Sequence, residues 1–183
     1  MITVQYKSGT SSELIQLPDN MKLTEHFRLV ELANNLGDPK QAQFIISDNS
    51  RDVLDMFEIF RIKYGSPINP TSGHRQPDFN KKVGGSSNSL HLQSCAMDFV
   101  DKAKKDPLWM FSSFIAALNY TGMVGAINLY REGNYNRYHI EGRSDIYLGY
   151  TRPHIRIYTT KAQYNTVKSL YQDLGIMVDY HGK

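Results

Sequence analysis

The sequence predicts a single α+β domain with a central antiparallel sheet flanked by helices. The chain has 183 residues, the usual length of one domain. Apolar residues make up 40% of the chain and aromatic residues 11%, which is enough for a hydrophobic core. Segments that alternate polar and apolar residues, typical of strands, occur beside segments with the apolar stripe of a helix. Both kinds of element are therefore expected in one fold.

The first 20 residues are predicted to form a hairpin that extends the main domain. Ile2, Val4 and Tyr6 alternate on one side of an early strand, and a Pro-Asp-Asn turn ends the segment at residues 18–20. The main domain would then cover residues 21–183, and it opens with a strand turn and a brief helix over residues 23–35.

Three helices are predicted further along the chain. The first covers residues 48–64, where Asp48 or Ser50 can cap the N-terminus. The second follows residues 106–107, where an aspartate cap precedes proline at the first helical position. It is hydrophobic on most sides, so we expect it to pack centrally. The third begins after Thr160, its predicted cap.

The remaining periodic segments are predicted to be strands. A buried strand covers residues 95–100, and a longer one covers residues 122–130. A hairpin then returns through residues 136–142. Residues 152–160 form another alternating strand, whereas the segment around His181 is expected to fray.

His91 and Asp98 are candidate metal ligands. Ligands of one zinc ion lie only a few ångströms apart, yet seven residues span about 10 Å in a helix and over 20 Å in a strand. The chain must therefore fold back between them, and residues 93–95 are the predicted bend. Strand alternation after this bend places Asp98 on the same face as Ala96, a small neighbour that leaves room for a metal and a substrate.

A catalytic zinc site typically has three protein ligands and keeps a fourth position for water. His139 is the candidate third ligand, and strand alternation puts Glu141 on the same face. A carboxylate in that place could accept a proton from the reacting water. His154 is the alternative third ligand.

Arg75 is a candidate substrate-binding residue because it follows a Ser-Gly turn at a strand end, and its planar guanidinium suits a peptide carboxylate. Asn80 is expected to bond the loop backbone, and His74 to be structural. Residues 84–85 are a glycine pair without the lysine and threonine of a phosphate-binding loop.

Composition excludes several classes of function. The net charge of +3 and the pI near 8.9 come from scattered basic residues, which does not favour nucleic-acid binding. The N-terminus resembles no secretory signal peptide, and no apolar window is long enough for a membrane span. We therefore expect synthesis in the cytoplasm without an export signal. The single cysteine, Cys95, excludes an internal disulfide and is expected to be buried.

Several motifs together resemble a known enzyme family. The segments SGHR, VGGSSNSLHLQSCAMD and YHIEGR, with Asn80, are similar to zinc D-alanyl-D-alanine carboxypeptidases and L-alanyl-D-glutamate endopeptidases, in their phage-type or bacterial members. The segment KLTEHFRLVELA extends the resemblance, which runs from Lys22 to Arg143. The resemblance implies a hedgehog/DD-peptidase-like fold over residues 21–183 and activity on peptidoglycan stem peptides.

The resemblance also implies roles for individual residues. Zn2+ would be bound by His91, Asp98 and His139. Arg75 would hold a carboxylate of the peptide substrate, and Ser89 would lie beside that substrate. If the substrate is cell wall, another component must deliver the protein, as with a phage lysin released by a partner pore or an enzyme carried by the virion.

Two positions depart from the family pattern. Ser94 replaces a glycine, and Asn136 stands where many members have an acidic general base. An amide cannot accept a proton at neutral pH. Glu141 is therefore the first candidate for the base, and Glu132 and Asp145 are weaker ones. The alternative function is a zinc-stabilised binding or structural module of a phage particle or cell-wall complex, without efficient turnover.

Overall fold

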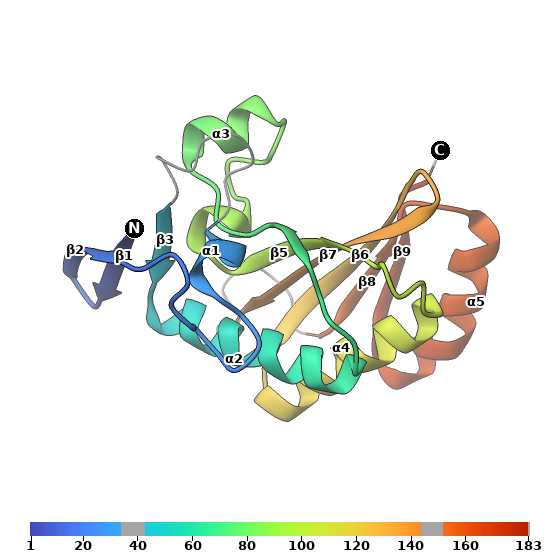
Figure 1. The fold of residues 1–183 in the computed structure, drawn as a ribbon. Coiled ribbons are helices and arrows are strands. Elements are labelled where there is room, and N and C mark those ends of the chain that lie inside the picture. The colour runs from blue at the N-terminus through green and yellow to red at the C-terminus, as the bar shows by residue number, and fades with distance from the viewer. Residues whose placement is uncertain (34–42, 144–151, 183) are drawn as a thin grey trace.

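A computed structural model describes residues 1–33, 43–143 and 152–182, and these residues form a six-stranded sheet, a three-stranded sheet and several helices (Figure 1). The six-stranded sheet has the order β4-β5-β7-β6-β8-β9. Its strands are β4 (Pro70–Ser72), β5 (Ala96–Val100), β6 (Val124–Glu132), β7 (Tyr135–Arg143), β8 (His154–Ile157) and β9 (Met177–Tyr180).

The predicted α+β fold with an antiparallel centre is confirmed. Strands β4, β5, β7 and β6 pair in antiparallel fashion, and β8 and β9 then join in parallel. The parallel part was not predicted. The expectation that the end of the chain frays was wrong, because β9 pairs with β8 and the amide of His181 donates to the carbonyl of Ile157 at 2.9 Å.

Three long helices lie on one side of this sheet (Figure 1). They are α2 (Asp48–Tyr64), α4 (Pro107–Thr121) and α5 (Lys161–Tyr171), as the sequence predicts. Asp106 and Thr160 cap α4 and α5. Ser47 is the N-cap of α2, and its Oγ accepts from the amide of Ser50 at 3.2 Å. Ser50, one of the two predicted capping residues, completes the capping box because its Oγ accepts from the amide of Ser47 at 2.8 Å.

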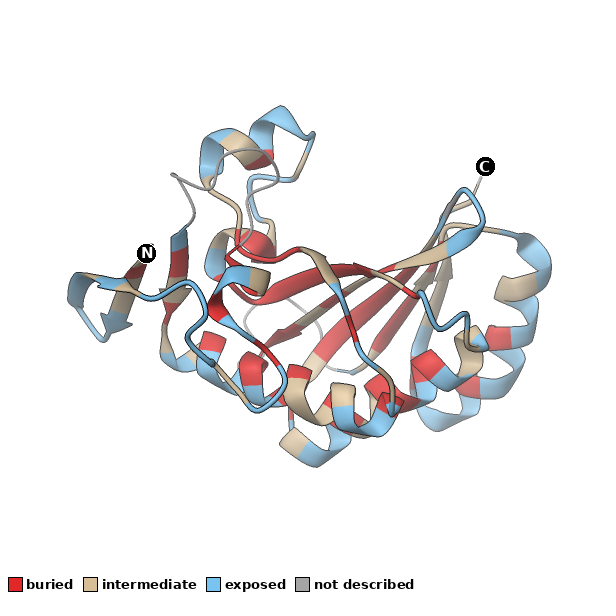
Figure 2. Cartoon of the chain, in the orientation of Figure 1, coloured by how far each residue is buried: buried red, intermediate tan, exposed pale blue. Residues whose placement is uncertain are grey.

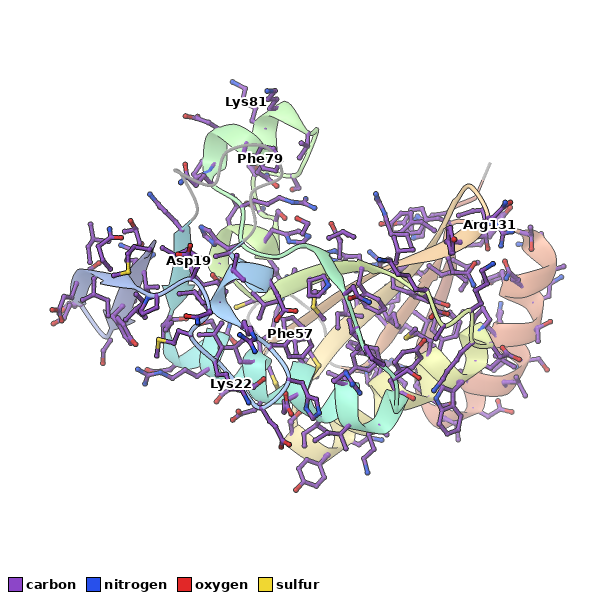
Figure 3. The ribbon with its side chains drawn as sticks, in the orientation of Figure 1. Asp19, Lys22, Phe57, Phe79, Lys81 and Arg131 are labelled. Atoms are coloured by element: carbon purple, nitrogen blue, oxygen red, sulfur yellow. The ribbon has the colours of Figure 1, made fainter. Side chains whose placement is uncertain are left out.

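Strand alternation separates an apolar face from a polar face of the sheet. Phe99 of β5 and Tyr138 of β7 are buried on the helix side, where their rings stack with centroids 5.5 Å apart. Phe60 of α2 packs 5.9 Å from Phe99, and the buried residue Phe57 lies on the same helix (Figure 3). Each such side chain contributes about 1.5–3 kcal/mol by burial. The core thus fixes which residues face away from the helices (Figure 2).

The predicted N-terminal hairpin is present as β1 (Ile2–Ser8) and β2 (Ser11–Leu17). It joins β3 (Gln43–Ile46), which pairs in parallel with β1 and was not predicted. The division into an extension over residues 1–20 and a domain over residues 21–183 remains a prediction. Strand β3, which belongs to the second of these parts, pairs with β1 of the hairpin.

Two short helices complete the fold. The brief helix predicted after residue 23 is α1 (Leu29–Leu32). A second, α3 (Pro77–Lys82), was not predicted and stands apart from the sheet with Phe79 and Lys81 (Figure 3). Among the described residues, no helix combines the length and apolarity required to span a bilayer.

Candidate metal centre

The three predicted metal ligands lie together on the polar face of the six-stranded sheet. Asp98 and His139 are directly opposite each other on β5 and β7. His91 lies in a single 3-10 turn, η2 (Leu90–Gln93), just before β5. Ser94 joins the two in a left-handed conformation with φ of 60°, so the predicted fold-back occurs there. One ligand atom from each of the three residues lies within 4.8 Å of the other two.

The spacing of these atoms fits one tetrahedral ion. Nδ1 of His91 donates to the carbonyl of Gly73 at 2.6 Å, which turns Nε2 toward the cluster. This Nε2 lies 3.2 Å from Nδ1 of His139 and 3.4 Å from Oδ1 of Asp98, and Nδ1 of His139 lies 2.8 Å from the same Oδ1. Tetrahedral ligands about 2.0–2.1 Å from zinc are about 3.3 Å apart. The donor set and its dimensions therefore fit zinc.

Burial and hydrogen bonding set the charges of the cluster. Burial raises the pKa of Asp98, but hydrogen bonds with His139 and His91 outweigh it and hold this pKa well below its usual range. Burial lowers the pKa of His91. Burial also acts to lower the pKa of His139, but hydrogen bonds with Asp98 and Glu141 raise it to about 9. A cation bound here would displace the His139 proton.

Arg75 lies at the edge of this cluster and contacts it directly. One terminal nitrogen forms an ion pair with Oδ2 of Asp98, and Nε donates to Oγ of Ser72 at 2.8 Å. The sequence predicted a substrate contact for Arg75 and gave no sign of the Asp98 pair. The guanidinium therefore helps to orient Asp98.

Glu141 contacts the outer nitrogen of His139. Its Oε2 lies 3.1 Å from Nε2 of His139, and its Oε1 lies 3.7 Å from a terminal nitrogen of Arg156. Burial acts to raise the pKa of Glu141, but the hydrogen bond with His139 and the nearby positive charges outweigh burial, so this pKa lies below its usual value. The carboxylate is therefore ionised, and it is placed to orient His139.

Two other candidates, His154 and Asn136, lie apart from the cluster. Nε2 of His154 lies 2.6 Å from Oδ2 of Asp179 on β9, away from the three predicted ligands. Asn136 accepts a hydrogen bond from Arg131 at 3.4 Å and does not line the pocket. Glu132 ends β6, and Asp145 lies outside the described residues.

The loop residues around the site support it. Nδ2 of Asn80 donates to the carbonyl of Ser86 at 2.8 Å, which confirms the predicted loop contact. His74 is buried and packs edge-on against Phe44, as expected for a structural residue. Oγ of Ser94 accepts from the amide of Ile45 at 2.8 Å, so the serine that replaces a glycine ties β3 to the bend.

The cluster opens into a polar pocket of about 490 Å³. Arg75, Ser89 and Glu141 line it together with the three candidate ligands. Sequence reasoning missed several further lining residues, among them Asn128, Tyr130, Arg137 and Arg156. Alternation along β7 could have found one of them, because it places Arg137 on the face of His139 and Glu141.

A buried cluster of two histidines and an aspartate beside a polar pocket is typical of a metallohydrolase. The family model described as Peptidase M15 matches residues 25–135 of the chain. The chain therefore belongs to the Peptidase M15 family of metallopeptidases, which confirms the resemblance seen in the sequence. The match includes Arg75, Ser89, His91 and Asp98, and it ends before His139 and Glu141. No curated protein matches the chain.

Proposed function

We propose that this protein is a zinc-dependent peptidase that hydrolyses peptide bonds in peptidoglycan stem peptides. The main support is the spacing of Nε2 of His91, Oδ1 of Asp98 and Nδ1 of His139, which is that of ligands around one tetrahedral ion. The adjoining pocket of about 490 Å³ is large enough for a short peptide.

Each residue of the site has a proposed part in the reaction. A zinc ion held by His91, Asp98 and His139 would supply Lewis-acid activation of water and of the scissile carbonyl. Glu141 is ionised, so a carboxylate oxygen can accept one proton from the water that adds to the carbonyl carbon. The same oxygen then returns this proton to the amine nitrogen as the carbon–nitrogen bond breaks.

Arg75 and Ser89 are proposed to position the substrate. Both line the pocket, and Arg75 approaches from the side of Asp98. Its Nε contacts Ser72 and one terminal nitrogen contacts Asp98, and the other terminal nitrogen carries further donors for a substrate carboxylate. Rigid placement of this kind lowers the entropy lost when the peptide reaches a reactive geometry.

The proposal is tested by incubating purified stem peptides with the protein in zinc and in excess chelator. Mass spectrometry of the products should show cleavage with zinc and none with chelator, and the fragment masses identify the bond. Intact peptides under both conditions, with zinc bound in the protein, would contradict the proposal.

A second candidate is a metal-stabilised wall-binding module without turnover. It is favoured by the contact of Glu141 with the outer nitrogen of His139, which already engages the proposed base, and by the amide at position 136. Sedimentation with purified cell walls, combined with the peptide assay, separates the candidates. Binding of walls by zinc-loaded protein without any cleavage would favour this module.

A further inference from the structure

Arginines outnumber carboxylates around the pocket. Within residues 1–33, 43–143 and 152–182, the lining contains four arginines and two carboxylates, which together carry two surplus positive charges without any contribution from the histidines. The arginines are Arg75, Arg137, Arg143 and Arg156, and the carboxylates are Asp98 and Glu141. Both carboxylates contact His139, and a bound cation would make the surplus larger.

The arginines lie on two sides of the candidate metal centre. The strand register forms one row across the sheet, from Asp98 on β5 through His139 and Asn128 to Arg156 on β8. Arg75 contacts the Asp98 end of this row. Arg156 lies two strands beyond His139, which corresponds to roughly 10 Å between backbones. A peptide that crosses the strands would meet positive charge on both sides of the metal.

Arg137 and Arg156 are held in place on the second side. Arg156 donates to Oδ1 of Asn128 at 3.3 Å, and its side chain is only 14% exposed. Arg137 lies over the ring of Tyr130, 5.3 Å from its centroid. Asn128 and Tyr130 are alternate residues of β6, so both arginines flank the same short stretch of strand. Their placement lowers the entropy cost of binding an anion.

Two of the described carboxylates near Arg156, Glu141 and Asp179, each have a closer contact with a histidine. Oε2 of Glu141 contacts His139 at 3.1 Å, closer than the 3.7 Å from its other oxygen to Arg156. Asp179 is the register partner of Arg156 on β9, but its Oδ2 lies 2.6 Å from Nε2 of His154. Neither Asp179 nor His154 lines the pocket.

We propose that Arg137 and Arg156 form a second carboxylate subsite, on the β6–β8 side of the metal centre and opposite Arg75. The substrate would then carry two carboxylates, one on each side of the reacting bond. Planar guanidinium groups are well suited to such a group because they donate two parallel hydrogen bonds. This inference rests on the proposed function for the identity of the ligand as a peptide.

The test uses two stem tetrapeptides that differ only at the α-carboxyl of the glutamate residue, which is free in one and a carboxamide in the other. The free C-terminal carboxylate is kept in both. Dissociation constants are measured by calorimetry with zinc-loaded protein at low temperature, and hydrolysis is followed separately. The variants are R137Q and R156Q. R131Q is the matched control, because Arg131 is exposed near the hairpin tip and lies outside the pocket lining (Figure 3).

The wild type and R131Q should bind the free acid about tenfold or more tightly than the amide. R137Q and R156Q should each reduce this preference to about threefold or less, with little change in affinity for the amide. R156K keeps the positive charge and should therefore retain more of the acid preference than R156Q. It also provides a folded variant at this position if glutamine disturbs the fold.

Equal affinity of the wild type for the two peptides, or a preference that survives in both glutamine variants, would overturn the subsite. The two proposals can fail separately. Cleavage without acid preference would leave the peptidase and remove the subsite. Acid preference without cleavage would leave the subsite and remove the peptidase.

Discussion

Nδ1 of His139 lies 2.8 Å from Oδ1 of Asp98 because the two residues are register partners on β7 and β5. Side chains opposite each other in an antiparallel pair begin about 4.5–5.5 Å apart at Cβ. The short aspartate therefore meets the nearer ring nitrogen of the histidine, and Nε2 remains for Glu141. Strand pairing alone thus places two of the three candidate ligand atoms.

Replacement of His139 by alanine should abolish tight zinc binding. The change removes one of three donors from a site that needs all of them, and it takes away the closer of the two histidines that contact the ionised Asp98. Zinc per chain after dialysis, measured by atomic emission, should fall from about one to near zero. H154A is the control, because His154 contacts Asp179 outside the cluster and should leave the zinc content unchanged. The reverse pattern would identify His154 as the ligand.

Replacement of Glu141 by glutamine should lower kcat at least a hundredfold, because the amide cannot accept a proton. Glu141 also contacts His139, so a second effect is expected. If the carboxylate only orients this ligand, E141Q should lose about 10- to 100-fold in zinc affinity. Activity measured over a series of zinc concentrations separates the two. If Glu141 accepts the proton, the rate of E141Q stays low even at saturating zinc. Full recovery of the rate at saturating zinc would show that Glu141 only orients His139. E132Q, at the weaker candidate, should keep the wild-type rate.

Sequence reasoning located the elements whose signals are local. Helix α2 and the β6–β7 hairpin each have enough residues to show a clear period, and Asp106 and Thr160 cap their helices as predicted. The fold-back between His91 and Asp98 could also be inferred, because chain dimensions exclude any straight path.

Elements defined by distant partners could not be predicted in this way. Strands β3 and β9 have four residues each, too few for a readable alternation, and both are stabilised by parallel pairing with strands far away in the sequence. The Arg75–Asp98 ion pair and the presence of Arg156 in the pocket depend on the strand order. The charges and the spacing of residues along the sequence contain no information about the strand order.

Two substitutions at Ser94 should separate backbone strain from hydrogen bonding. S94A keeps a Cβ at φ of 60° and removes the acceptor of the Ile45 amide, so we expect a loss of about 1–3 kcal/mol in the free energy of unfolding. S94G also removes the acceptor but relieves about 1 kcal/mol of left-handed strain. Urea denaturation should therefore rank the proteins as wild type, S94G and S94A, in decreasing stability. Higher stability of S94G than of the wild type would mean that the Ile45 contact contributes little.

The buried His74 should make stability depend on pH in the acidic range. Burial lowers its pKa from 6.5 in the unfolded chain to about 4, with further lowering by the charges of His91 and Lys7. Between these values the unfolded state binds more protons than the folded state, so stability falls as the pH drops below 6.5 and the loss levels off near 4. The whole effect is about 3 kcal/mol.

H74F keeps an aromatic ring beside Phe44 and removes the titrating group. The free energy of unfolding of wild type minus that of H74F should therefore decrease by about 2 to 3 kcal/mol between pH 7.5 and pH 4.5. Urea denaturation of both proteins in chelator measures this difference, and the other histidines cancel because both proteins share them. H26F is the control, since His26 is a surface residue paired with Glu58. A pH-independent difference between wild type and H74F would mean that His74 is protonated inside the fold, with Ser94 as its acceptor.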